Sequence, residues 1–281
     1  MPFTLSHAAA ALPLRRFNLV WSAFVIGTFA PDFEYFLRLA PESRYGHGFP
    51  GVFIFTLPTA LAIFWTFQVV VKRPVEDLLP IGIQRRLIRD AEATQNSSAR
   101  RLLTVLISVS SGIATHVIWD SLTHPQNWVY QLVPSAGASM IVIPLIGSFS
   151  IFNLLDYGSS IIGASALGVW FVYWYTHTEP VPSSEARSLK ASSKVTIVLV
   201  MVVIAMIGAA IRVAALSGSS AHHVFPGLVL AYFVVTSIGL FLWQMVVYAL
   251  MRNSMRARSF KSSADSNRVR YGAANKRFYL M

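Results

Sequence analysis

Five stretches of the chain are almost continuously apolar, and most polar and charged residues fall between them. A helix that crosses a bilayer core of about 30 Å requires about 20 consecutive apolar residues. The stretches that meet or approach this length cover residues 51–71, 102–119, 158–175, 195–216 and 226–251. We therefore predict an all-α fold, a polytopic membrane helical bundle with five full spans.

A sixth apolar stretch, residues 17–30, is shorter than the others. It has fourteen residues before Pro31 and Asp32 interrupt the pattern. A helix of that length reaches about 21 Å, which is less than the thickness of the hydrocarbon core. We expect a short re-entrant or tilted N-terminal helix, and a sixth crossing helix is the alternative.

The composition agrees with this pattern and limits the kinds of chemical site that the chain can form. Hydrophobic residues make up 54% of the 281 positions and charged residues 12%, about half of the charged share that is typical of soluble domains. The chain has no cysteine. Disulfides, thiolate metal sites and a cysteine nucleophile are therefore excluded, and a metal ion would have to be held by histidine or by oxygen ligands.

The distribution of basic residues predicts the orientation. Seven Lys and Arg residues lie in 72–101, three in 176–194 and eight in 252–281, whereas 120–157 and 217–225 have none. Basic loops are retained preferentially in the cytoplasm. We expect a multi-pass protein of the cell inner (plasma) membrane with a cytoplasmic C-terminal tail. The net charge of +11 then reflects topology and contact with membrane lipids, and we expect no nucleic-acid partner.

The same pattern suggests how the chain divides. We expect residues 1–251 to form a single integral membrane domain, with the residues of chemical interest within 1–125. Residues 252–281 are rich in Ser, Asn, Arg and Lys, which is typical of disordered segments. They are expected to form a basic, disordered tail.

The second predicted span ends in HVIWDSLTHP, in which two ionisable residues are four positions apart. On a helix, His116 and Asp120 share a face with Ser108 and Gly112, so this face is expected to contact protein or water rather than lipid. A His/carboxylate pair with this spacing can bind one metal ion. The alternative is a buried, hydrogen-bonded pair that caps the helix end.

Further residues of ligand type occur in the N-terminal region. Asp32 and Glu34 lie in APDFEYF after the short apolar stretch, and His47 lies in SRYGHGFPG before the first span. The loop charges place Asp32, His47 and the HxxxD pair at one, outer membrane face, which favours a metal site. His7, in TLSHAAAA, can join them only if the short stretch does not cross the membrane completely. Taken singly, Asp32 is also compatible with a helix N-cap or a turn residue, and for His47 alone a loop histidine is the favoured interpretation.

These motifs carry two resemblances. The sequences MPFTLSHAAAALP, APDFEYFLR, RYGHGFPG and HVIWDSLTHP resemble an uncharacterised family of bacterial multi-pass membrane proteins with a domain of unknown function. A more distant resemblance is to membrane-bound metal-dependent hydrolases related to the zinc-dependent phospholipase C group, with an early His followed by PDxDH, HRGxTH and HxxxDxxTP. The chain is similar to this pattern over about 125 residues. It departs from it at Tyr35, where the pattern has His, and it lacks the first His of HRGxTH.

The second resemblance implies a set of metal ligands. A single divalent metal, with zinc as the expected ion, would be held by Asp32, His47, His116 and Asp120. His7 would bind a second ion. The missing histidines put a centre of two or three metal ions in doubt.

The leading hypothesis from these observations is a metal-dependent hydrolase that acts on a phosphoester or another ester, including a lipid-linked one, at the outer membrane face. Asp120 or Glu34 would act as a base or orient a ligand imidazole, and Arg44 would hold an anionic phosphate. The alternative is a non-enzymatic scaffold, or a degenerate hydrolase with a structural His/Asp site. A transporter is less compatible, because the spans contain almost no internal charge.

Overall fold

Five long apolar helices dominate the structure, a computed structural model that describes residues 4–91, 99–123, 132, 140–143, 147–181, 189–219 and 226–278. The helical segments long and apolar enough to cross a membrane are Val52–Leu78, Ala99–Thr123, Ile151–His177, Ala191–Leu216 and Pro226–Arg258. Each coincides with one of the five predicted spans. A helix is favoured in lipid because it satisfies its backbone hydrogen bonds internally. The prediction of an all-α, multi-span membrane fold is confirmed.

The N-terminal region consists of short elements. They are η1 (Thr4–Ala11), η2 (Pro13–Arg16), α1 (Trp21–Phe29), η3 (Ala30–Asp32) and α2 (Phe33–Arg38). Pro31, which cannot donate a helical hydrogen bond, lies in η3 where the regular helix of α1 has ended. With nine residues, α1 is about 14 Å long, too short to cross a bilayer. It corresponds to the short helix expected from the sequence.

The first span is one helical rod assembled from several segments. They are α3 (Phe49–Gly51), η4 (Val52–Thr56), α4 (Leu57–Thr66), η5 (Phe67–Val71) and α5 (Lys72–Leu78), of which η4 and η5 are π-helical. After Pro80 the amphipathic helix α6 (Ile81–Ala91) follows.

The remaining elements are four long helices and one hairpin. They are α7 (Ala99–Thr123), β1 (Met140–Ile143), β2 (Gly147–Ser150), α10 (Ile151–His177), α11 (Ala191–Ser219) and α12 (Pro226–Phe278). The strands are antiparallel, with Met140 opposite Ser150 and Ile143 opposite Gly147. This hairpin is the exception to the all-α architecture among the described residues.

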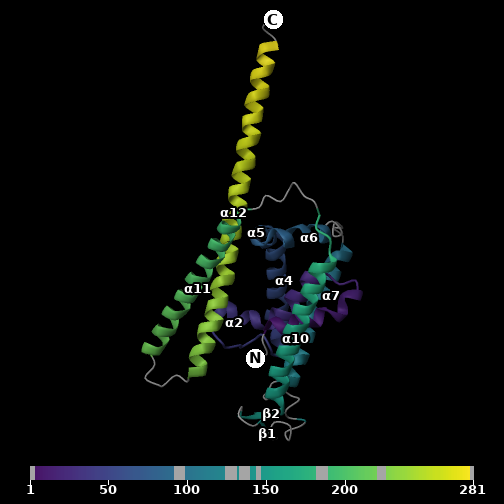
Figure 1. The fold of residues 1–281 in the computed structure, drawn as a ribbon, viewed down its shortest axis with the longest axis vertical. Coiled ribbons are helices and arrows are strands. Elements are labelled where there is room, and N and C mark those ends of the chain that lie inside the picture. The colour runs from purple at the N-terminus through teal and green to yellow at the C-terminus, as the bar shows by residue number, and fades with distance from the viewer. Residues whose placement is uncertain are drawn as a thin grey trace.

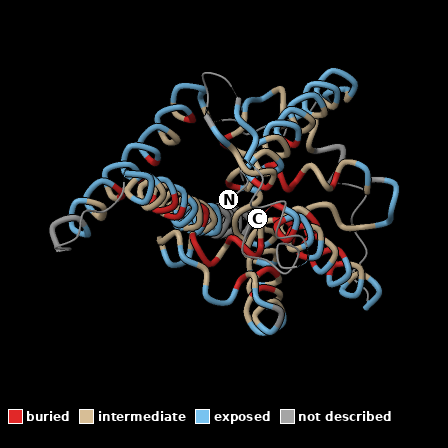
Figure 2. Tube along the Cα trace, turned by 90° about the horizontal axis from the view of Figure 1, so that it is seen from below, coloured by how far each residue is buried: buried red, intermediate tan, exposed pale blue. Residues whose placement is uncertain are grey.

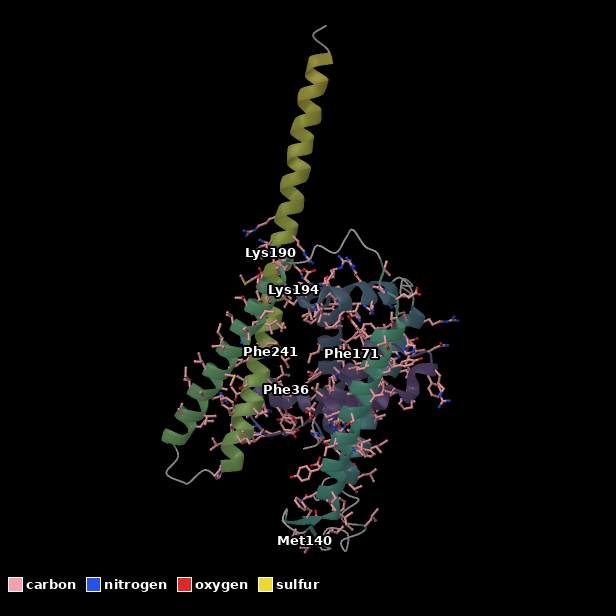
Figure 3. All side chains as sticks on the ribbon, in the orientation of Figure 1. Phe36, Met140, Phe171, Lys190, Lys194 and Phe241 are labelled. Atoms are coloured by element: carbon pink, nitrogen blue, oxygen red, sulfur yellow. The ribbon has the colours of Figure 1, made fainter. Side chains whose placement is uncertain are left out.

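The helices form two groups that meet at α2 and at the first span. In Figure 1, α11 and α12 run side by side, and α12 packs against α2, η5 and α5. In the other group, α7 packs against α1, and α10 packs against η1 and α7. In Figure 3, Met140 of the hairpin lies at the bottom of the view, and Lys190 and Lys194, near the start of α11, lie higher up, below the projecting part of α12.

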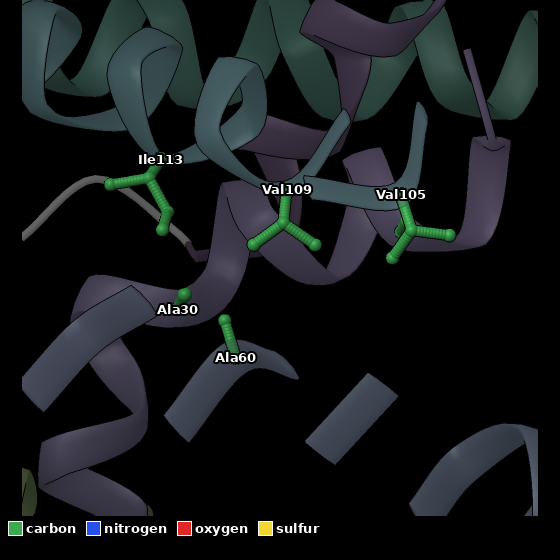
Figure 4. Close-up of a cluster of buried hydrophobic side chains, with 6 residues drawn as sticks. Ala30, Ala60, Val105, Val109 and Ile113 are labelled. Carbon is green, nitrogen blue, oxygen red and sulfur yellow. The ribbon is translucent and has the colours of Figure 1, made fainter. Parts of the chain in front are cut away.

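A small apolar core lies where α1, α4 and α7 meet. Its buried members are Ala23, Ala30, Ala60, Val105, Val109 and Ile113, and all of them except Ala23 are labelled in Figure 4. Gly112 brings α7 close to α1, because a Cβ atom at this position would collide with the backbone oxygen of Phe24. Buried positions lie mainly where the elements meet, and exposed positions line the outer faces of the long helices (Figure 2). This packing brings α1, η3 and one face of α7 together.

The C-terminal segment continues α12 beyond the membrane span. Residues 252–278, expected to be part of a disordered tail, are helical in the structure. Helix propagation adds one hydrogen bond for each residue that is fixed, and no proline interrupts the sequence after 226. The domain boundary at residue 251 stays a prediction. His124 and the pair His222 and His223, which the sequence suggests as pocket and loop residues, lie outside the described residues.

Candidate metal centre

The five side chains predicted as metal ligands lie together in the structure. They are His7 from η1, Asp32 from η3, His47 from the loop before α3, and His116 and Asp120 from α7. Nε2 of His116 lies 3.2 Å from Oδ2 of Asp120 and 3.7 Å from Oδ1 of Asp32. Nε2 of His47 lies 3.3 Å and 3.6 Å from the same two oxygens. Two imidazoles and two carboxylates therefore point at one common position.

These nitrogen–oxygen separations are those expected for pairs of ligands on one small metal ion. Zinc binds histidine nitrogen and carboxylate oxygen at about 2.0–2.2 Å, so neighbouring ligand atoms at the tetrahedral angle are about 3.3–3.5 Å apart. The four nitrogen–oxygen distances of 3.2–3.7 Å bracket that value. The buried His/Asp cluster can thus hold a metal ion.

His7 lies at the edge of the same cluster. Its Nε2 is 3.5 Å from Oδ1 of Asp120, the oxygen that does not face His47. Its ring stacks on that of His116, with the centroids 4.0 Å apart. The packing of η1 against α1, α7 and α10 brings His7 beside the other four residues. His7 can therefore complete the same centre or, through Asp120, contribute to a second one.

The helical face that carries the HxxxD pair is covered by protein, as predicted. Ser108, Gly112, His116 and Asp120 are all buried. The hydroxyl of Ser108 accepts a hydrogen bond of 2.9 Å from the backbone N–H of Val20, which precedes α1. A polar stripe on a membrane helix is thereby kept out of lipid, where it would be costly.

The tautomer of His116 is set by α1. Nδ1 lies 2.7 Å from the carbonyl oxygen of Thr28, and a carbonyl can only accept, so Nδ1 carries the proton. The lone pair of Nε2 then faces the carboxylate of Asp120. Within the described residues, this buried nitrogen makes no well-aligned hydrogen bond. Two acceptors this close require either a metal ion or a proton between them.

Asp32 is oriented by a contact within the N-terminal region. The hydroxyl of Thr4 donates a hydrogen bond of 2.8 Å to Oδ2 of Asp32, which leaves Oδ1 facing His47 and His116. Burial raises the pKa of Asp32, against the opposing effect of the nearby histidines. A cation would favour the ionised carboxylate and compensate for this burial.

Glu34, expected as a base, lies in a separate set of contacts. Its Oε1 accepts hydrogen bonds from Nε of Arg38 and the backbone N–H of Arg44, at 2.7 and 3.0 Å. Its Oε2 accepts from the hydroxyl of Ser43 and the N–H groups of Tyr45 and Gly46, at 3.0, 2.8 and 2.8 Å. Burial alone would raise the pKa of Glu34, but the backbone and hydroxyl donors outweigh it and lower the pKa to about 2.

The other residues expected to act in catalysis differ in position. Asp120 belongs to the cluster itself. The side chain of Arg44 is exposed, while its backbone binds Glu34. Tyr35, at the position where the hydrolase pattern has His, is buried with its ring centroid 5.9 Å from that of His47. Its burial raises the pKa of the phenol, and the nearby carboxylate of Asp32 adds to the effect.

Sequence reasoning missed the residues that orient the ligands. Thr4 binds Asp32, the Thr28 carbonyl binds His116, and Ser43 lies 3.2 Å from Nδ1 of His47. For Ser43 the signal was available, since it lies four residues before His47 in the same loop. No local pattern links Thr28 to His116, which are 88 positions apart.

Comparison with known families assigns the chain to one of them. The model of a family described as a domain of unknown function, DUF4184, matches residues 1–250. The chain belongs to the DUF4184 family. The matched region contains all five clustered side chains and all but the end of the fifth span. No curated protein and no solved structure matches the chain, so the DUF4184 assignment brings no activity with it.

Proposed function

We propose that this DUF4184 protein is a membrane-bound metal-dependent hydrolase whose ion is held by Asp32, His47, His116 and Asp120. The observation that carries the proposal is the set of nitrogen–oxygen separations of 3.2–3.7 Å between the two histidines and the two carboxylates. Nitrogen and oxygen ligands in this number suit zinc. His7, beside Oδ1 of Asp120, is the additional ligand of this ion or of a second one.

The ion and the protein would have different tasks. A divalent cation at this position supplies Lewis acidity and lowers the pKa of water. His47 is the most accessible of the five side chains, with 27% of it exposed against 1% for His116, so substrate enters from its side. Arg44, exposed and three residues away, binds an anionic phosphate on the way in. Asp120, which faces both His47 and His116, accepts a proton from the attacking water or orients it.

The depth of the cluster favours a substrate with a lipid part. His116 lies seven residues before the end of α7, which is about 10 Å along the helix axis. A phosphoester or ester attached to a lipid can reach that depth without leaving the membrane. With the basic loops in the cytoplasm, the cluster opens to the outer side of the plasma membrane.

Elemental analysis of the purified, detergent-solubilised protein tests the metal site. We expect about one zinc ion for each wild-type chain, and none in His116→Ala. A panel of phosphoester and carboxylic ester substrates then tests hydrolysis, with turnover by the zinc-loaded wild type and none by Asp32→Ala. A wild-type protein that binds no divalent metal would refute the proposal.

A structural site is the second candidate, favoured by the nearly complete burial of four of the five side chains. A scaffold, or a hydrolase that has lost its activity, would bind metal for stability alone. In that case removing the ion lowers the unfolding temperature, while no member of the substrate panel is turned over at any zinc concentration. The two measurements together separate the candidates.

A further inference from the structure

We infer that Glu34 and Ser43 are positioning residues that hold the imidazole of His47 with its Nε2 toward the metal centre. The inference rests on the proposed metal site and concerns residues outside its ligand set. Glu34, at the start of α2, binds the loop that leads to His47. Ser43, in that loop, joins the carboxylate of Glu34 to the imidazole.

The first step is that the Glu34 carboxylate accepts hydrogen bonds from the backbone of this loop. Three consecutive backbone N–H groups, those of Arg44, Tyr45 and Gly46, point at its two oxygens at 2.8–3.0 Å. Successive N–H groups of this kind form a concave site for an anion. Here the anion is a side chain of the same protein, only 1% of which is exposed. The loop is thereby fixed to α2 up to the residue directly before His47.

The second step is the direction of the hydrogen bonds through Ser43. Its hydroxyl is 3.0 Å from Oε2 of Glu34 and must donate there, because an ionised carboxylate can only accept. The same oxygen lies 3.2 Å from Nδ1 of His47. Having given its only proton to Glu34, Ser43 can only accept, so Nδ1 of His47 carries the proton. The lone pair of His47 is therefore on Nε2, which faces Asp32 and Asp120.

The third step is a comparison of the two histidines. His116 lies on a long helix, is almost fully buried and donates from Nδ1 to the carbonyl of Thr28. His47 lies on a loop, is partly exposed and has no such carbonyl partner among the described contacts. Partners of this kind fix the ring and raise the basicity of the ligand nitrogen, and their loss typically lowers metal affinity about 10- to 100-fold. We assign that role for His47 to the pair of Glu34 and Ser43.

The close packing of the loop supports a positioning role. Gly46 is buried, and a Cβ atom there would collide with the backbone oxygen of Pro31, next to Asp32. The hydroxyl of Thr56 donates to the carbonyl of Gly46 at 3.1 Å. The loop is thus held from α2, from η3 and from the first span.

The experiment is a zinc-competition titration of the full-length protein in detergent. Ser43→Ala removes the acceptor for Nδ1, and we expect its zinc Kd to rise about 10- to 100-fold. Ser43→Thr keeps the hydroxyl and should restore an affinity close to that of the wild type. Ser22→Ala is the matched control, because the Ser22 hydroxyl accepts a comparable side-chain hydrogen bond from Gln68 without contacting the cluster. It should bind zinc as the wild type does.

Glu34→Gln tests the other half of the pair. An amide keeps the size of the side chain but turns one acceptor into a donor, which opposes the N–H groups of the loop. We expect a weaker zinc affinity here as well. If Glu34→Gln fails to fold, Ser43→Ala and its threonine counterpart carry the test, since neither changes a charge.

A second measurement does not depend on metal binding. In metal-free wild-type protein with ¹⁵N-labelled histidine, the NMR spectrum should show that Nδ1 of His47 carries a proton. Ser43→Ala should lose this preference for protonation at Nδ1. Equal zinc Kd values for Ser43→Ala and wild type would overturn the inference while leaving the metal site intact, and so would a wild-type His47 that is protonated on Nε2 alone. Absence of zinc binding by the wild type would refute the proposed function instead.

Discussion

Helices α7 and α10 are similar in length and both are apolar enough to cross a membrane, yet they differ sharply in their surroundings. About a third of the most apolar 18-residue stretch of α7 is buried inside the protein. In the corresponding stretch of α10, 6% is buried. The buried face of α7 carries Ser108, His116 and Asp120. The face of α10 at Ile162 and Val169 is largely exposed and suits contact with lipid.

The difference shows what coverage by protein allows. α7 packs on α1, and its polar side chains form hydrogen bonds with the backbone of the N-terminal region. Polar groups are tolerated at membrane depth where protein surrounds them, because their hydrogen bonds can then be satisfied. α10 is covered mainly by η1, so most of its surface has to be apolar. Matched substitutions on the two helices test this interpretation.

The largest expected effect concerns the histidine of each helix. His116→Ala should abolish stoichiometric zinc binding, because it removes a buried ligand of the cluster. His177→Ala, at the exposed end of α10, should leave the zinc content unchanged, since the contacts of His177 within the described part of the chain are with neighbours on its own helix. Elemental analysis of both variants measures their zinc content and tests this prediction. Equal zinc content in the two variants would contradict the contrast between the helices.

The next effect concerns a glycine on each helix. At Gly112 of α7 a methyl group would collide with the backbone of α1, whereas at Gly168 of α10 nothing lies within 4 Å of the added atom. We expect Gly112→Ala to lower the free energy of unfolding by about 3 kcal/mol, because backbone cannot move aside easily. Gly168→Ala should change it by less than about 1 kcal/mol. Unfolding measured in detergent by circular dichroism checks both values.

A smaller effect is expected for a valine on each helix. Val109 is fully buried in the core of α1, α4 and α7, and Val169 is largely exposed on α10. Val109→Ala removes two packed methyl groups and should cost about 1–3 kcal/mol. Val169→Ala should leave the unfolding curve almost unchanged. A similar cost for both would mean that α10 is packed against protein in the membrane, for example against a second copy.

The smallest effect concerns the hydrogen bond that joins the two helices. Nε1 of Trp119 on α7 donates to the hydroxyl of Ser159 on α10 at 3.1 Å. A neutral hydrogen bond of this kind contributes about 0.5–1.5 kcal/mol. A double-mutant cycle with Trp119→Phe and Ser159→Ala should yield a coupling energy near the lower value, since Trp119 is exposed. A coupling of zero would indicate that packing, and not this hydrogen bond, holds α7 and α10 together.

Much of the fold could be predicted from the sequence, because membrane spans depend on length and apolarity alone. The five spans and the short helix before Pro31 follow from these two properties. The ligand types could be predicted as well, since an ionisable residue such as His116 or Asp120 in an apolar stretch is unusual. The orientation of the spans, the identity of the ion and the reaction remain predictions.

The sequence by itself determined which residues are candidates: His7, Asp32, His47, His116 and Asp120. Only the tertiary structure decided that they converge, because their distances depend on how α1 packs against α7 at Gly112 and on how the N-terminus returns beside them. The structure also separated Glu34 from the ligands, since the carboxylate is bound to three backbone N–H groups of the loop before His47. Local sequence cannot show such a contact, because the contact joins groups that become neighbours only when the chain folds.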